Sequence, residues 1–359
     1  MVLCEISNLT NSPLLDFVIA WSTLTLLGGA SIFLMSGTVF YYYYACVTFE
    51  KWKRKLNPEF PSAAKVRLEI QQMFKSLMAA TLVPSLTLVL SQEKFLSLGL
   101  TKAYCGLEPH GEVPWGLSPA GYLLAQFFVF WVVSDFFEWA YHQVGHRFSW
   151  CWAIHRHHHV CQSFRSRNRT TRLRTPFYPF FPRAANPAPP AVFNPSPFSV
   201  ISDEWADQVV RTSPLLFIPM LLPTNMDLLF AQFAIFFYAY GVYLHWGYES
   251  PLISAHNPWV NGSYEHYYHH AFSGGDTPIY TGFFFKIWDQ CVGSVARGGC
   301  ICSVCEERKG KRSFAEWERV RAKLPDYSVL LKPEFWFGDA AAETVVAPRT
   351  PTKSTHKRH

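Results

Sequence analysis

Four long apolar segments constrain this chain more than any other feature of its sequence. They cover about residues 14–47, 76–100, 119–141 and 214–244. A helix of roughly 20 mostly apolar residues crosses a bilayer, because it satisfies its own backbone hydrogen bonds in hydrocarbon. The composition agrees: 16% of the residues are charged, against about 25% in an ordinary soluble domain. We therefore predict an all-α, multi-pass transmembrane helical protein.

The four segments differ in detail. No Lys or Arg precedes the first one, and it is too long for a cleaved secretory signal, so we expect a retained anchor. The second is broken at Pro84, and the third carries Asp135 and Glu138 near its end. The fourth contains Pro219 and Pro223. Its two legs look short, which predicts a hairpin that enters the membrane and returns.

Basic residues set the expected orientation. Residues 48–75 contain seven Lys and Arg residues, so this loop is expected in the cytosol and the N-terminus in the lumen. The third segment then ends on the cytosolic side. Anionic lipid headgroups suffice as partners for the net charge of +6, and no motif indicates nucleic-acid binding. The nine cysteines lack regular spacing, which predicts thiols rather than a disulfide framework.

The chain divides into four parts by composition. We expect a lumenal end with anchor helices (1–118), a His-rich di-metal domain (119–299), a cytosolic extension (300–338) and a disordered tail (339–359). Residues 162–199 are rich in Arg and hold eight prolines, which predicts an unstructured loop. We hypothesise that residues 160–191 are an unspliced intron or a lineage insertion. A transcript that lacks this segment would support the intron, and one that contains it would exclude it.

Histidines recur at helical spacing in three places. His142 and His146 are four residues apart, and two later groups both read H-x-x-H-H: His155, His158 and His159, then His266, His269 and His270. Residues three and four apart share a helix face, so each group can direct its imidazoles at one point. Alone, each group also fits a polar helix end or a basic surface. Together, eight imidazoles exceed one tetrahedral zinc site, so we predict two adjacent metal ions.

Other residues are candidates around this centre. His245 is either a ninth ligand or a hydrogen-bond partner of one. Metal-bound imidazoles usually donate their other N–H to a carboxylate or carbonyl, so we expect Asp135, Glu138 and Asp289 to support the ligands, the alternative being a solvated helix end. A separate run holds Cys300, Cys302 and Cys305. These thiols are close enough to bind zinc, but no second Cys or His pair adjoins them, and His256 reads as a loop residue.

The choice of metal rests on what the motifs lack. Imidazole binds zinc, copper, iron and nickel alike, but zinc hydrolases place a carboxylate inside the motif, as in H-E-x-x-H. No such motif occurs here. A thiolate-free site beside aromatic, apolar segments suits two irons that use O₂ against unactivated C–H bonds, with water kept out. A membrane zinc hydrolase or transporter, and an inactive scaffold or sensor, are the alternatives.

The motifs resemble the signature of the fatty acid hydroxylase/sterol desaturase superfamily. The similar stretches are SDFFEWAYHQVGH, LHWGYE, NGSYEHYYHH and TGFFFKIWDQCVGS, within about residues 120–295. The resemblance implies a non-haem di-iron, O₂-dependent oxidoreductase of the endoplasmic reticulum membrane. By position, it implies iron ligation by His142, His146, His155, His158, His159, His245, His266, His269 and His270.

The resemblance also implies partners and a substrate class. Electrons would come from NAD(P)H through a reductase and cytochrome b5, and the substrate would be a sterol or a fatty acyl lipid. The local wording is closest to the sterol C-5 desaturase branch (lathosterol oxidase-like). Fatty acid or sterol hydroxylases and C-4 methylsterol oxidases of the same superfamily are the alternatives.

Overall fold

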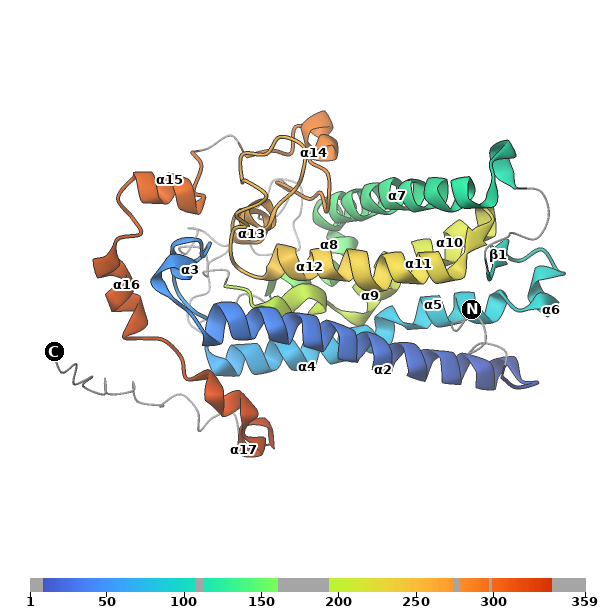
Figure 1. The fold of residues 1–359 in the computed structure, drawn as a ribbon, viewed down its shortest axis with the longest axis horizontal. Coiled ribbons are helices and arrows are strands. Elements are labelled where there is room, and N and C mark those ends of the chain that lie inside the picture. Colours follow the sequence, from blue (N-terminus) through green and yellow to red (C-terminus); the bar gives the residue numbers. More distant parts are fainter. Residues whose placement is uncertain (1–8, 107–112, 161–193, 274–277, 297–298, 338–359) are drawn as a thin grey trace, which may run out of the picture.

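The computed structural model describes residues 9–106, 113–160, 194–273, 278–296 and 299–337, without the side chains of residues 93, 94 and 156–160. In these ranges the protein is an elongated helical bundle (Figure 1). Its strands are β1 (Ala103–Tyr104) and β2 (Thr224–Asn225), which pair in parallel, with Ala103 opposite Thr224. The prediction of an all-α architecture is confirmed for this part of the chain.

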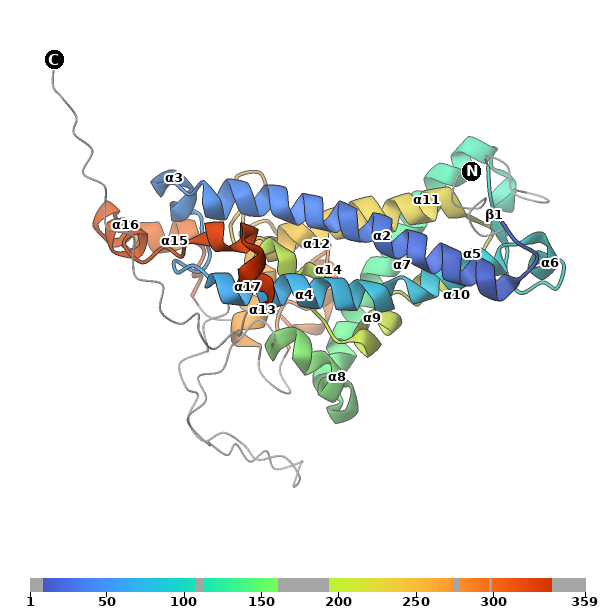
Figure 2. The same cartoon turned by 90° about the horizontal axis from the view of Figure 1, so that it is seen from below.

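Four helical units are long and apolar enough to cross a membrane. The first is α2 (Pro13–Phe40) with the π-helical η1 (Tyr41–Ala45), and the second is α4 (Ala63–Ala80) with α5 (Leu82–Leu90). The third is α7 (Pro119–Arg147), and the fourth joins α11 (Met226–Ala231), η4 (Gln232–Phe237) and α12 (Tyr238–His245). All four run along the long axis of the molecule in both views (Figures 1 and 2).

Shorter elements lie around these four units. They are α3 (Phe49–Lys53), α6 (Glu93–Leu96), η2 (Pro114–Gly116), α8 (Ser149–Val160), η3 (Pro197–Ile201), α9 (Trp205–Arg211), α10 (Pro214–Leu221), α13 (Ser263–Phe272), α14 (Ile287–Val292), α15 (Ser303–Arg308), α16 (Phe314–Arg321), η5 (Tyr327–Leu331) and α17 (Pro333–Phe337). One end of the bundle, at the right of Figure 1, holds β1, α6 and the starts of α7 and α11. The other end holds α3, α13 and α15, and we call it the α13 end.

The start of α7 follows from its local sequence. Ser118 accepts a hydrogen bond from the Gly121 N–H at 3.2 Å, and Pro119 occupies the first helical position, where no N–H is needed. The helix then continues for 29 residues. This length carries its last residues to the α13 end, where the histidines of this helix lie.

The outer faces of the long helices remain apolar. Leu26 of α2 is 73% exposed, and Leu124 of α7 and Ile235 of η4 are similarly uncovered. Their inner faces hold small and polar residues: Thr25 contacts Thr81 at 2.7 Å between hydroxyl oxygens, and a Cβ on Gly29 would lie 3.2 Å from Leu77. Close packing through small residues with apolar side chains outside is typical of helices in lipid.

Two expectations about segment boundaries were wrong. The second apolar unit begins at Ala63 rather than near residue 76, because its charged residues are buried by pairing: Glu69 accepts from the Ser196 hydroxyl, and Arg67 donates to the Phe335 carbonyl. The fourth segment is a hairpin of unequal legs. Its second leg, Met226–His245, is 20 residues long and is therefore long and apolar enough to cross a membrane, so the expectation of two short legs was wrong.

The expected loop and the expected thiols also need correction. Residues 194–201 are buried, and η3 packs against α2 and α4, so the unstructured loop does not extend to residue 199. Most of the proposed insertion at 160–191 and the whole tail at 339–359 lie outside the described residues. Cys105 is disulfide-bonded, near β1 and far from the α13 end. The other cysteines that the structure describes are free.

Candidate metal centre

Seven of the nine predicted histidine ligands come together at the α13 end of the bundle. The first histidine group contains His142, His146, His155 and His269, and the second contains His245, His266 and His270. Within each group, one nitrogen per ring lies within 4.8 Å of the others. His158 and His159 belong to α8, but their side chains lie outside the described residues. Four helices therefore contribute to an all-imidazole centre.

The first group forms because α8 folds back onto α7. His142 and His146 are one turn apart near the end of α7, and Phe148 leaves the helical conformation and ends it. His155 then lies against Gly145, where an added Cβ would be only 3.1 Å from the ring. His269 of α13 completes the group, with its Nε2 3.2 Å from Nε2 of His146. Glycine at position 145 is thus what allows His155 to approach.

The second group joins the last residue of α12 to one face of α13. His266 and His270 are four residues apart on α13, and their Nε2 atoms are 3.0 Å apart. Nε2 of His245 lies 2.9 Å from Nε2 of His266. His266 Nε2 therefore faces two ring nitrogens at hydrogen-bonding distance.

These contacts indicate a kind of partner that the second group could bind. Nδ1 of His245 is 2.8 Å from the Gly241 carbonyl oxygen, so Nδ1 carries the hydrogen and Nε2 carries a lone pair. In three neutral rings, one hydrogen on His266 cannot serve both neighbours. A cation between the rings could be bound by one nitrogen of each, and neutral imidazole nitrogen is a common metal ligand.

Backbone carbonyls orient two rings of the first group in the same way. Nδ1 of His142 donates to the Thr281 carbonyl at 3.1 Å, and Nδ1 of His269 donates to the Ile279 carbonyl at 2.7 Å. Each bond leaves Nε2 as the lone-pair nitrogen that faces the group. The donor set of both groups therefore fits metal ions.

The spacing of the nitrogens also bears on coordination geometry. Two nitrogens that lie 3.0 Å apart, as in His266 and His270, and about 2.1 Å from a shared ion subtend about 90° at it. Tetrahedral ligands at the same bond length would be about 3.4 Å apart. The contacts of 2.9–3.2 Å are thus short enough for the rings concerned to share one metal ion.

The two groups are neighbours. His269 and His270 are consecutive in α13 but serve different groups, and their ring centroids are 5.3 Å apart. A narrow cavity of about 20 Å³ lies between the groups, lined in part by Tyr141, Phe283 and Glu138. This volume is roughly that of one small molecule such as water. The centre therefore combines two possible ion sites with a small, enclosed space.

An acidic and basic network supports the first group from α9. Nδ1 of His155 lies 3.5 Å from Oδ1 of Asp207, and the Tyr141 hydroxyl donates to the same carboxylate. Burial alone would raise the pKa of Asp207, but the hydrogen bond and charge of His155 outweigh it and lower that pKa below its ordinary value. Arg211 completes the network, donating to Asp203 at 2.6 Å and to Glu138 at 3.1 Å.

The three carboxylates predicted to support the ligands bind backbone groups and side chains other than the ligand histidines. Asp135 accepts from the backbone N–H of Phe284 at 2.6 Å and from the Trp288 indole at 2.6 Å. Glu138 pairs with Arg211. Asp289 accepts from the Thr281 hydroxyl at 3.0 Å and from the Gly282 N–H at 2.8 Å.

The expected direct bond from these acids to a histidine is therefore wrong. Asp135 and Asp289 fix the loop at 279–286, because this loop has backbone N–H groups to satisfy. The loop in turn presents the carbonyls that orient His142 and His269. Sequence reasoning missed Asp207, the one described carboxylate that contacts a ligand histidine. Its signal was the polar stretch SDEWADQ at residues 202–208, five residues before the fourth apolar segment.

A buried ion pair orients α13, which supplies three of the histidines. Glu265 accepts from the Gly262 N–H at 2.9 Å and contacts Nζ of Lys286 at 2.5 Å. Lys286 also donates to the Asn257 carbonyl at 2.6 Å. Burial raises the pKa of Glu265, and Lys286 opposes that effect. The pair thus fixes the first turn of α13 to the loops on both sides of it.

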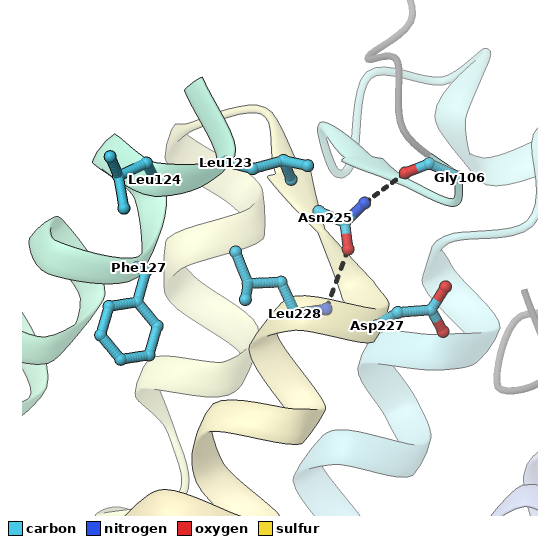
Figure 3. A pocket seen from close by; sticks show the side chains of 7 residues that line it. All are labelled: Gly106, Leu123, Leu124, Phe127, Asn225, Asp227 and Leu228. Atoms are coloured by element: carbon cyan, nitrogen blue, oxygen red, sulfur yellow. Dashed lines mark hydrogen bonds between the residues drawn. The ribbon is translucent and has the colours of Figure 1, made fainter. Parts of the chain in front are cut away.

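A larger apolar pocket lies far from the histidines. It has a volume of about 540 Å³ and is lined by Leu123, Leu124, Phe127 and Leu228 with Asn225, Asp227 and Gly106 (Figure 3). Phe127 and His142 are 15 residues apart on one helix, or roughly 22 Å. The pocket does not adjoin the metal centre and offers no ligand to it.

Comparison of the chain with protein-family models, curated proteins and solved structures finds no match. The class defined by the fold and the site is therefore a helical protein with four possible membrane spans and two adjacent histidine groups that could each hold a metal ion.

Proposed function

We propose that this chain is a membrane-bound, non-haem di-iron oxidase of lipid C–H bonds. We assign it to the fatty acid hydroxylase/sterol desaturase superfamily and, within that group, to sterol C-5 desaturation. One observation carries the proposal: seven imidazoles, with no thiolate among them, form two adjacent groups at one end of an apolar helical bundle. The alternatives within this superfamily are a fatty acid or sterol hydroxylase and a C-4 methylsterol oxidase, which differ in the lipid that is bound or in whether a hydroxyl group or a double bond is formed.

Iron suits this centre better than zinc. No carboxylate lies inside a histidine motif to act as the base of a zinc hydrolase. An all-nitrogen site without thiolate is within the range that iron accepts.

When bound, two irons with O₂ and two electrons would supply an oxidant able to take hydrogen from an unactivated C–H bond. The chain's own residues hold and enclose it. His146 and His269 are buried, and Tyr141 and Phe283 line the space between the groups, so bulk water is kept from the reaction. Asp207 holds the Nδ1 proton of His155 and keeps that ring oriented.

The cavity limits how a lipid can reach the centre. Its volume of about 20 Å³ is far below the roughly 300–1,000 Å³ of pockets that enclose drug-sized ligands. We therefore propose that only the reacting carbon of the sterol approaches the histidines, while the rest of the sterol stays outside the cavity. Exposed apolar side chains on α7, such as Phe136, suit a substrate that arrives from the bilayer.

We place the protein in the endoplasmic reticulum membrane with its α13 end in the cytosol. The Lys-rich α3 region lies at this end (Figure 1), as the positive-inside rule requires. The disulfide-bonded Cys105 lies near the opposite end, and disulfides persist in the oxidising lumen. A cytosolic centre would receive electrons from NAD(P)H through a reductase and cytochrome b5.

Sterol and fatty acid profiles of cells with and without this protein test the proposal. In cells without the protein we expect loss of a Δ5-unsaturated sterol and accumulation of the precursor that is saturated at this position. In cells with the protein, the conversion should depend on O₂. In cells that lack the protein, expression of His155→Ala or His269→Ala should leave the lipid profile uncorrected although each variant still inserts. Expression of His356→Ala, a change in the tail, should restore the profile fully. An unchanged lipid profile, or turnover by either ligand variant, would refute the assignment. A hydroxylated product would favour the hydroxylase alternative.

A further inference from the structure

A third cluster of metal-binding side chains lies outside the histidine centre. It consists of His256 with Cys300, Cys302 and Cys305, whose ligand atoms all lie within 4.8 Å of one another. Nε2 of His256 is 3.5 Å from Sγ of Cys302, 3.5 Å from Sγ of Cys305 and 3.9 Å from Sγ of Cys300. Because 44 residues separate His256 from Cys300, the cluster is not visible as a motif.

We propose that these four residues form a structural zinc site of the Cys₃His type. For Zn–S bonds of about 2.3 Å and a Zn–N bond of about 2.1 Å, tetrahedral geometry places nitrogen about 3.6 Å from each sulfur. The three distances in the protein fall on both sides of this value. The two kinds of site differ in ligand type, since the histidine groups contain no thiolate.

The local backbone supports thiolate ligands. Cys302 is the N-cap of α15, and its sulfur accepts from the Cys305 N–H at 3.4 Å. The sulfur of Cys300 accepts from the Cys302 N–H at 3.4 Å. Such N–H donors stabilise negative charge on sulfur. Lys309, which donates to the Cys300 carbonyl at 3.0 Å, adds a cation beside three thiolates and one zinc ion.

A disulfide does not explain the cluster. All three cysteines are free thiols, and an odd number gathered around one imidazole leaves at least one sulfur over in any pairing. The cluster also lies at the α13 end, which the proposed topology puts in the reducing cytosol, where Cys/His groupings more often bind metal than form disulfides. Four protein ligands complete a tetrahedral zinc shell and leave no position for a substrate.

The site would fasten the C-terminal extension to the scaffold of the histidine centre. Cys302 is 1% exposed and packs in one apolar cluster with Tyr264 and Tyr267 of α13. Tyr264 also contacts Cys300 and accepts from the Ile301 N–H. His256 lies in the loop whose carbonyls bind Lys286. A zinc ion here therefore crosslinks residues 300–308 to the loop that leads into α13, whichever metal the histidine groups hold.

Metal analysis of the purified full-length protein tests this site separately from the histidine centre. We expect about one zinc per chain, with three sulfurs at about 2.3 Å and one nitrogen in its X-ray absorption spectrum. The Cys302→Ser/Cys305→Ser variant should lose this zinc and keep its iron. The control Cys291→Ser, which changes an exposed free thiol on α14, should keep both metals.

His256 provides a second test that does not depend on folding of the cysteine variant. Because its side chain is exposed, His256→Ala should insert normally but give weaker zinc retention against a chelator, whereas His256→Cys should retain zinc in a four-sulfur shell. Absence of zinc from the wild-type protein, or a zinc shell without sulfur, would overturn the proposal. Unchanged zinc content in the double cysteine variant would overturn it too.

Discussion

The approach of His155 to Gly145 gives the sharpest test of how the first histidine group is built. A Cβ added at Gly145 would lie 3.1 Å from Cγ of His155 and 3.3 Å from its Cβ and Cδ2. Carbon atoms pack best at about 3.5–4.0 Å. Gly145→Ala therefore has to push α8 or the His155 ring outward by about 0.4 Å.

The size of the effect follows from two opposing contributions. Overpacking by one methyl group typically costs about 1–3 kcal/mol, while alanine in place of glycine stabilises a helix by about 1 kcal/mol. The higher helix propensity of alanine stabilises the fold as a whole, whereas the displacement of His155 weakens metal binding by this ligand. Since about 1.4 kcal/mol corresponds to a tenfold change, we expect iron affinity and turnover to fall by about 10- to 100-fold, with near-normal stability.

The assay compares Gly145→Ala with Gly37→Ala, each purified in detergent. Gly37 lies in α2, also within a membrane-length helix, and a Cβ there would meet nothing within 4 Å. Iron content, chelator resistance and sterol turnover are measured for both. Gly37→Ala should match the wild type. If Gly145→Ala also binds iron and turns over like the wild type, the close contact does not position His155 and the reasoning fails.

Two further variants test the surroundings of the centre, and thiol labelling tests the disulfide at Cys105. Asp207→Asn keeps an acceptor for His155 but removes the charge, so metal affinity should fall by about 10–100-fold; unchanged chelator resistance would contradict this. Lys286→Met leaves Glu265 buried without its cation and should destabilise the protein by about 3–5 kcal/mol in detergent, with recovery when Glu265→Gln is added; a single variant as stable as the wild type would contradict it. Cys105 should react with a maleimide only after reduction, and labelling without reductant would argue against the disulfide.

The sequence predicted those parts of the protein that depend on local periodicity. The apolar run of α7 and the spacing of His142 and His146 define a helix and one of its faces, and both are present. The repeated H-x-x-H-H pattern also indicated that α13 would direct several rings to one side. The assignment of His269 to one histidine group and of His266 and His270 to the other was not predictable. It depends on which neighbouring helix each face of α13 contacts.

Features that depend on distant packing were not predictable. The charged residues of α4 made its start difficult to predict, since Glu69 is buried in contact with Ser196 of a distant segment and with Lys65. Asp207 contacts His155 through the packing of α8 against α9. His256 meets the cysteines only in the folded chain. Each of these contacts joins segments whose separation in the sequence gives no spacing rule.

Metal analysis of the intact protein tests the central claim most directly. The purified full-length chain is loaded with ferrous iron without O₂, and iron is counted per chain and examined by X-ray absorption at the iron edge. The account predicts two irons per chain with only nitrogen and oxygen in their first shell. Fewer than two irons, sulfur in the iron shell, or histidine groups that retain zinc and exclude iron would contradict it.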